Sequence, residues 1–358
     1  MKKKQEVIFL ITNEDVLNAL STVMDPDLGR DLVSLKMIKD IKIEDGTVSF
    51  SIVLTTPSCP LKGKIENDAR RAVYAMTEAK EVIIDMTSKV QTPKTLDLAG
   101  NCFKHVIAIG SGKGGVGKST VSLNVALSLA NDGARVGLLD ADIYGPNIPR
   151  MLGLDSLPEP FGKKMLPAEI YGMKVASIGF MVQPGQPLIW RGPMLHSAIQ
   201  QFLTDFDWGD LDYLVVDLPP GTGDVQLSLA QSMPISGAVI VTTPQEMAID
   251  DAHRAVNMFA KLDIPIFGIV ENMAYLEMPD GSRQYIFGNG GGERLAETVG
   301  TEFLGSIPID AKVGFGNDNG LPVVKQEPLS PVGEDLVKIA RNIAAEASKA
   351  AYKKSQAE

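Results

Sequence analysis

The sequence is poor in the residues that form disulfides and metal sites. Its 358 residues include two cysteines, Cys59 and Cys102, and three histidines. Two cysteines are too few for a secreted disulfide framework, so the chain is expected to fold around an ordinary hydrophobic core in a reducing compartment. The histidines are scattered along the chain without metal-ligand spacing, and we expect them to be structural.

A basic surface and a long apolar run are also missing. The net charge is −10, whereas proteins that bind nucleic acid non-specifically need a basic face to displace counterions. The apolar run at residues 7–11 is soon followed by Asn13, Glu14 and Asp15, so it is too short for a signal peptide. No other window approaches the roughly 20 apolar residues of a membrane helix. We therefore expect a cytoplasmic protein that binds neither nucleic acid nor membrane.

The sequence contains two regions with different patterns of apolar residues. The pattern of the first region predicts a small α+β domain at residues 12–90. Thr12 can cap its first helix. Asp45-Gly46 joins two alternating segments, which is the strongest short signal for a β-hairpin. Helices are expected at 14–24 and 59–76, and strands at 38–44, 47–56 and 81–87.

The second region follows a polar linker expected at 91–101. Between residues 102 and 345, apolar runs of β type alternate with helix-length segments. Continuous apolar strands are buried on both faces, as in a parallel sheet flanked by helices, so the expected fold class is a doubly wound, mostly parallel α/β domain. After residue 331 we expect a helix that docks on the core, and residues 346–358 form its C-terminal tail. The predicted strands lie at 105–110, 135–142, 174–180, 212–220, 237–243, 264–272 and 302–309.

Residues 110–120, GSGKGGVGKST, carry two overlapping motifs. The dinucleotide-binding motif G-x-G-x-x-G begins at Gly110, and the more specific phosphate-binding motif G-x-x-x-x-G-K-S/T begins at Gly112. In the second motif, backbone N–H groups cradle phosphates at a helix N-terminus, Lys118 reaches the β and γ phosphates, and Ser119 ligates Mg²⁺. A nicotinamide enzyme has no use for this Lys-Ser pair, so the motif favours a nucleoside triphosphatase over a dehydrogenase.

Two aspartates at strand ends complete this interpretation. Asp217 ends an apolar strand and is followed by a glycine-containing loop, as expected for the second acidic group near the metal of a P-loop protein. Asp142 follows the strand after the P-loop helix, where ligands bind in open α/β sheets. A carboxylate there could orient or deprotonate the attacking water. Both residues could instead be turn or helix-cap aspartates.

The sequence resembles a known family. KGGVGKST, LLDADIYGPNIPRMLG, IWRGPM, WGDLDYLVVDLPPGTGD, IVENMAY and IFGNGGGERLA together look like the Mrp/ApbC family of deviant Walker A P-loop ATPases. MDPDLGRDLVSL and VLTTPSCPLK are similar to the small iron–sulfur assembly domain that precedes the ATPase in many members. The resemblance implies a Mg·ATP-dependent homodimeric ATPase that assists iron–sulfur cluster assembly or cluster transfer to apoproteins, with those apoproteins or an assembly scaffold as partners.

The resemblance also implies a role for each site residue. The catalytic set is Lys113, which crosses a dimer interface to the partner's nucleotide as an arginine finger does, Lys118, and Asp142, which positions water. Asp217 holds Mg²⁺ through water, together with Ser119. The implied ATP-binding residues are Gly112, Lys113, Gly114, Gly115, Val116, Gly117, Lys118, Ser119 and Thr120, with Asn272 at the adenine edge and Pro308 and Asp310 beside the base. The γ phosphate is sensed by the second switch, Gly221, Thr222, Gly223 and Asp224.

The cysteines that would carry a cluster depart from the family pattern. In many members a C-x-x-C precedes the FG-x-G-G-G segment, and two subunits bridge one 4Fe–4S cluster with four thiolates. Residues 271–292 contain no cysteine, so no cluster ligands are assigned. Cys59 lies at or just before a helix start, where the dipole should lower its thiol pKa. It could handle metal or cluster, or be an ordinary buried cysteine, and Cys102 is expected to be a core or linker residue.

The sequence leaves two other functions open. A partitioning or spatial-organisation ATPase shares the deviant loop but acts on DNA or membrane, against which the acidic charge and the small N-terminal domain both count. A metal-free regulator of assembly fits the missing C-x-x-C.

Overall fold

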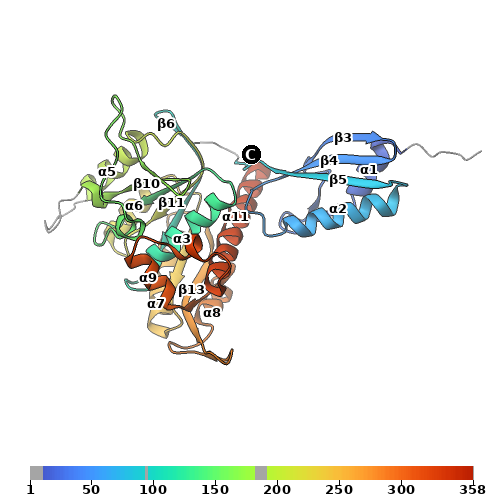
Figure 1. Cartoon of the computed structure of the whole chain (residues 1–358). Coiled ribbons are helices and arrows are strands. Elements are labelled where there is room, and N and C mark those ends of the chain that lie inside the picture. The colour runs from blue at the N-terminus through green and yellow to red at the C-terminus, as the bar shows by residue number, and fades with distance from the viewer. Residues whose placement is uncertain (1–10, 93–95, 182–191, 358) are drawn as a thin grey trace, which may run out of the picture. The chain divides into compact units, whose positions relative to one another are not determined.

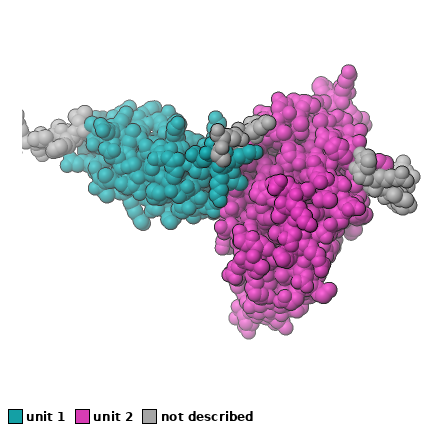
Figure 2. All heavy atoms as spheres, turned by 180° about the vertical axis from the view of Figure 1, so that it is seen from behind, with its two compact units in different colours: residues 1–91, 348–358 teal, residues 92–347 magenta. Residues whose placement is uncertain are grey.

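The computed structural model describes residues 11–92, 96–181 and 192–357. The first three residues of the IWRGPM segment, 189–191, lie outside these residues. The chain divides into two compact units, the first formed by residues 1–91 and 348–358 and the second by residues 92–347 (Figures 1 and 2). Each unit is built around its own hydrophobic core.

The first unit is a three-stranded sheet with two helices. The strand order is β3-β4-β5, with β3 antiparallel and β5 parallel to β4. Alternate residues of β4 are buried, and these meet the apolar faces of the helices. The elements are α1 (Asn13–Leu20), β1 (Met24–Asp25), β2 (Arg30–Asp31), β3 (Ile38–Glu44), β4 (Thr47–Leu54), α2 (Lys62–Met76) and β5 (Glu81–Ser88).

Local sequence signals account for these boundaries. Thr12 caps α1 in a reciprocal arrangement, because its Oγ1 accepts a hydrogen bond from Asp15 N and the Asp15 carboxylate accepts one from Thr12 N. Asp45 and Gly46 both have positive φ, 51° and 88°, as a two-residue hairpin turn between β3 and β4 requires. The predicted helices and strands of this unit are therefore present, with shifted ends.

The second unit is a doubly wound α/β domain. Its elements are β6 (Leu96–Leu98), β7 (Asn101–Gly110), α3 (Lys118–Asn131), β8 (Val136–Asp140), α4 (Ile148–Leu152), β9 (Ala168–Ile170), β10 (Met173–Ser177), the 3-10 helix Ile178–Met181, α5 (Gly192–Thr204), β11 (Asp210–Asp217), α6 (Asp224–Gln231), β12 (Gly237–Thr242), α7 (Glu246–Ala260), β13 (Ile266–Glu277), β14 (Arg283–Gln284), α8 (Gly291–Val299), β15 (Phe303–Ile309), α9 (Ala311–Asp318), α10 (Val323–Gln326) and α11 (Pro331–Ala357).

In the described residues of this unit, ten strands form one sheet in the order β14-β13-β12-β7-β11-β8-β10-β9, with β15 beside β13 and β6 beside β7. The seven strands predicted from the sequence are mutually parallel, and the short β6, β9 and β14 are antiparallel additions. Val106 and Ala108 of β7 pack in the cluster that includes α5 to α8, whereas Ile107 and Ile109 are buried outside it. The sheet is thus covered on both faces, and the predicted fold class is confirmed.

Two segments differ from the expectation. The linker expected at 91–101 includes β6, because Leu96 and Leu98 alternate and pack against the core while β6 pairs with β7. The expected tail continues α11, and from Ser348 onward it groups with the first unit, where Lys349 lies 3.3 Å from Asp27. Among the described residues, none of the helices combines the length and apolar character that crossing a bilayer requires.

Candidate functional site

The glycine-rich loop follows β7 at the centre of the sheet, between β11 and β12. Gly112 lies against α7, where an added Cβ would be 2.1 Å from the backbone carbon of Asp251, so no larger residue fits. Gly117 has φ +85° and caps α3, and an added Cβ there would be 2.1 Å from Asn272 Nδ2. Both glycines therefore keep the loop in close contact with its neighbours.

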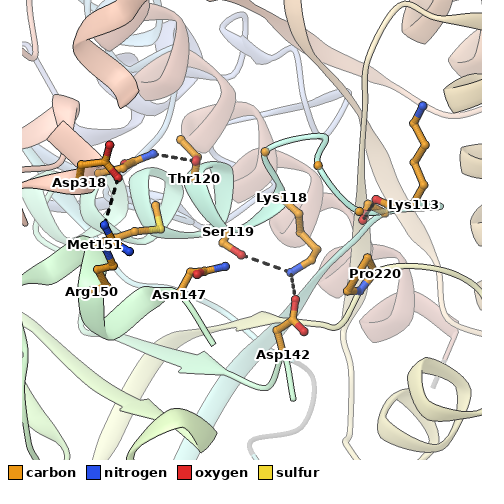
Figure 3. Close-up of a pocket in the computed structure, with 15 residues that line it drawn as sticks. Lys113, Lys118, Ser119, Thr120, Asp142, Asn147, Arg150, Met151, Pro220 and Asp318 are labelled. Atoms are coloured by element: carbon orange, nitrogen blue, oxygen red, sulfur yellow. Dashed lines mark hydrogen bonds and ion pairs between the residues drawn. The ribbon is translucent and has the colours of Figure 1, made fainter. Parts of the chain in front are cut away.

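Lys118, the first residue of α3, lies among carboxylates that follow two strands and hydroxyl groups of α3 itself (Figure 3). Its Nζ is 2.9 Å from Asp217 Oδ1 and 3.3 Å from Asp142 Oδ2. Asp217 also accepts hydrogen bonds of 2.6 Å from Ser119 Oγ and from Ser122 Oγ. The Lys118 and Asp217 side chains are 5% and 0% exposed, so this is a buried ion pair.

Burial and neighbouring charge shift the pKa values in this cluster. Burial acts to lower the pKa of the Lys118 ammonium, but Asp217 and Asp142 outweigh it, and the pKa is raised. Burial raises the pKa of Asp142, although Lys118 opposes the shift. Burial, followed by the charge of Asp217, raises the pKa of the neighbouring Asp140 to about 8. Lys118 stays cationic, and Asp142 binds a proton more readily than an exposed aspartate, as a general base must.

A pocket of about 320 Å³ opens over the loop. This volume is at the lower end of the range typical of small-molecule sites. Figure 3 shows the pocket extending from Lys118 and Asp142 past Ser119 and Thr120 to Arg150, Met151 and Asp318. The lining residues are Ser111, Lys113, Gly114, Gly115, Gly117, Lys118, Ser119, Thr120, Asp142, Asn147, Arg150, Met151, Pro220, Asn317 and Asp318.

The other predicted site residues lie around this pocket in different ways. The Lys113 side chain extends away from Lys118 and Asp142, and its Nζ is 3.3 Å from Gln245 Oε1 at the start of α7 (Figure 3). The second switch follows β11: Gly221 N donates to Ser111 O at 3.0 Å, and Thr222, Gly223 and Asp224 lead into α6.

Three residues predicted near the base are not part of the pocket lining. Asn272 is buried behind the loop and donates from Nδ2 to Val116 O at 2.8 Å. Pro308 belongs to β15, and Asp310 caps α9 by accepting from Lys312 N at 2.8 Å. The far wall is made instead by residues of α4 and α9 that the sequence interpretation missed. GPNIPRM belongs to a segment that carries the family resemblance, but that resemblance assigns none of its residues to the site, and GFGND is a turn-like segment outside every segment of the resemblance.

The expectation for the thiol of Cys59 is wrong. Cys59 lies before the start of α2 and is half-buried, and burial, together with the charges of Asp25 and Asp27, raises its pKa to about 11. The helix dipole does not offset the lost hydration. Cys102 lies within β7 rather than before it, half-buried and also with a raised thiol pKa, chiefly through burial. Within the described residues, no three His, Cys, Asp or Glu side chains are grouped to hold a metal.

The cysteine-free segment at 271–292 includes the hairpin of β13 and β14. The Arg283 guanidinium lies 4.1 Å from the centre of the Tyr275 ring, and Tyr285 packs edge-on against Tyr275 at 6.3 Å. Such contacts stabilise a hairpin but offer iron no thiolate.

The fold and this site define a P-loop nucleotide-binding protein. Residues 102–344 match the family described as NUBPL iron-transfer P-loop NTPase, and residues 13–85 match the family described as iron-sulfur cluster assembly protein. The chain belongs to this iron-transfer P-loop NTPase family, which confirms the resemblance found in the sequence.

Similar proteins span nearly the whole chain. A protein of Synechocystis named iron-sulfur cluster carrier protein is 48% identical over 96% of this chain and 99% of its own. A Deinococcus radiodurans protein of the same name is 50% identical over 94% of this chain and 96% of its own. A solved nucleotide-binding protein from Archaeoglobus fulgidus, in complex with ADP, is 41% identical with a TM-score of 0.55 over 61% and 87%. MinD of Pyrococcus furiosus shares the fold. It is 23% identical, with a TM-score of 0.50, over 67% of this chain and 98% of its own.

Proposed function

We propose that this protein binds and hydrolyses ATP as a homodimer in the cytoplasm and acts in iron–sulfur cluster assembly or cluster transfer to apoproteins. The names of its relatives and the two family matches support the cluster role. The observation that carries the ATPase proposal is the cluster at the glycine loop, where Lys118, Ser119 and Asp142 line one pocket and the buried Asp217 bonds Lys118 and Ser119.

ATP binding exchanges one set of ionic contacts for another. The Lys118 ammonium would turn from the carboxylates of Asp217 and Asp142 to the β and γ phosphates, and the loop N–H groups would bind the remaining oxygens. Lys118 needs no change in protonation for this, because its pKa is raised. Nucleotide binding therefore releases both aspartates for other contacts.

Ser119 and Asp217 suit magnesium. Their oxygens lie 2.6 Å apart at the loop end of β11, and hydroxyl and carboxylate oxygens are ligands that Mg²⁺ accepts. A bound Mg²⁺ would neutralise charge on the phosphates. Asp142 then orients the attacking water and takes its proton as the water oxygen bonds to the γ phosphorus and ADP leaves.

The second loop lysine supports a dimeric mechanism. Lys113 lines the pocket of its own chain, but its side chain extends away from Lys118 and Asp142, and its ammonium contacts the neutral Gln245 amide. Its long, flexible side chain is therefore suited to reach the phosphates of a nucleotide held by a second copy of this chain. In that position it would stabilise charge in the transition state.

Replacement of the two lysines tests this division of roles. Lys118→Ala should abolish nucleotide binding, whereas Lys113→Ala should keep ADP binding and lose ATP-dependent dimerisation and hydrolysis. Calorimetry, light scattering and phosphate release measure the three properties. Lys261→Ala, an exposed lysine at the end of α7, is the control. Hydrolysis by Lys113→Ala at the wild-type rate would overturn the dimer mechanism.

The cluster role is tested by anaerobic reconstitution with iron and sulfide, followed by visible absorption and iron counting. We expect the wild type to hold iron, and comparison of Cys59→Ser with Cys102→Ser shows whether either thiol takes part. If the wild type holds none above background, direct carriage is wrong, and metal-free regulation of assembly, which the missing C-x-x-C favours, takes its place. ATP-dependent co-sedimentation with liposomes or DNA would instead indicate a partitioning ATPase.

A further inference from the structure

The pocket end opposite Lys118 is formed by the last turn of α9 and by α4. Asn317 and Asp318 of α9 and Arg150 and Met151 of α4 line it. In Figure 3, Arg150, Met151 and Asp318 lie at the end of the pocket away from Lys118 and Asp142. The motifs of the glycine loop explain the Lys118 end of the pocket and leave this end without a function.

Asn317 has an unsatisfied acceptor in this wall. Its Nδ2 donates to Thr120 Oγ1 at 3.0 Å, which fixes the carboxamide against the first turn of α3. Its Oδ1 is buried and has no hydrogen-bond partner. A buried acceptor without a donor is unfavourable, and a bound ligand that supplies an N–H or O–H would relieve it.

The chemistry of a nucleotide limits which group that is. Phosphate oxygens are acceptors, so the donors of a bound nucleotide are the ribose hydroxyls and the amino group of the base. Thr120 accepts from Asn317, which leaves its own proton available for a phosphate oxygen. Because ribose is the next group after the α phosphate, Asn317 Oδ1, beside Thr120, is positioned for the sugar rather than the base.

We propose that Asn317 Oδ1 accepts a hydrogen bond from a ribose hydroxyl, making this end of the pocket a ribose subsite that selects ribonucleotides over deoxyribonucleotides. The proposal rests on the proposed nucleotide binding and goes beyond it. Asn317 would bind the sugar through Oδ1, while its Nδ2 bonds Thr120 beside the loop that holds the phosphates.

The test uses the full chain and three probes: ADP, 2′-deoxyADP and 3′-deoxyADP, each titrated by calorimetry with Mg²⁺. On the wild type, at least one deoxy analogue should bind about tenfold more weakly than ADP, as expected when a buried acceptor loses its donor. On Asn317→Ala this ratio should fall to about one. Asn319→Ala is the matched control, because Asn319 is exposed at the end of α9 and its Nδ2 donates to Phe315 O within the same helix.

Each outcome decides the question. Equal binding of all three nucleotides to the wild type would overturn the ribose subsite, and this comparison does not depend on any variant folding. A purely structural role for Asn317 would weaken all three probes alike in Asn317→Ala and keep the wild-type ratio, which also overturns it. Failure of the wild type to bind ADP or ATP at all would instead overturn the proposed nucleotide binding itself.

Discussion

Replacing Lys118 by methionine removes a buried ammonium and leaves buried carboxylates behind. The Lys118 Nζ pairs with Asp217, whose side chain is 0% exposed, at 2.9 Å, and with Asp142, whose side chain is 8% exposed, at 3.3 Å. Breaking one side of a buried pair destabilises a protein by about 3–5 kcal/mol, because the remaining charge has lost its partner and cannot reach water. For a unit of this size, that corresponds to a fall in Tm of about 6–20 °C.

Tryptophan fluorescence on the full chain without nucleotide measures this loss in the second unit alone. Both tryptophans of the chain, Trp190 and Trp208, lie between residues 92 and 347, and Trp208 is fully buried. Lys113→Met is the matched control on the same loop, and we expect its Tm to stay within about 2 °C of the wild type, since the contact of the Lys113 ammonium to Gln245 is partly exposed and neutral.

A second substitution separates lost charge pairing from lost packing. Adding Asp217→Asn to Lys118→Met removes the unpaired charge but keeps an amide that can bond the hydroxyls of Ser119 and Ser122. This double variant should recover more than half of the lost Tm. The reasoning fails if Lys118→Met melts with the wild type, or if the double variant is no more stable than the single one.

Three further predictions concern other parts of the site. Gly112→Ala should destabilise the second unit and abolish ADP binding, because the new Cβ would lie 2.1 Å from the α7 backbone; Gly114→Ala, whose nearest contact would be 3.8 Å, should melt like the wild type in the same assays. Asp142→Asn should retain ADP binding and lose about 100-fold or more in phosphate release, the usual contribution of a general base. Iodoacetamide should alkylate Cys59 of the native protein slowly at pH 7, because its pKa is about 11 and only the thiolate reacts. The rate, followed by mass spectrometry, should rise about tenfold per pH unit up to pH 10, and a plateau below pH 9 would contradict the raised pKa.

The phosphate end of the pocket could be predicted because its chemistry is local in sequence. Lys118 and Ser119 follow the glycine loop directly, and the loop must follow a strand and begin a helix. Asp142 and Asp217 come from different strands, but parallel neighbours end at the same edge of the sheet, and Asp217 is opposite Asp140 in register. Strand order beyond these neighbours was not needed to bring the four residues together.

The opposite end of the pocket could not be predicted in this way. Asn317 and Thr120 are 197 positions apart, and they meet only because α9 returns across the start of α3. The Asn-Asp pair at 317–318 is typical of a helix end, so its composition predicts a turn. The prediction that the pKa of Cys59 is lowered failed for a related reason. The sequence shows that Cys59 precedes a helix, whereas the burial that outweighs the helix dipole depends on how the unit packs.

The two lysines of the glycine loop differ in what holds them, and this makes the dimer mechanism testable apart from stability. Lys118 is enclosed by carboxylates, so its replacement affects folding and binding together. Lys113 is held by one 3.3 Å contact to the Gln245 amide, and giving up such a contact at a partly exposed site costs about 1 kcal/mol or less. Its ammonium is therefore free to exchange Gln245 for a stronger anionic partner. A loss of hydrolysis in Lys113→Ala with unchanged Tm and ADP affinity is the result that a missing contact to a second subunit predicts, because the contact of this side chain to Gln245 within its own chain contributes little.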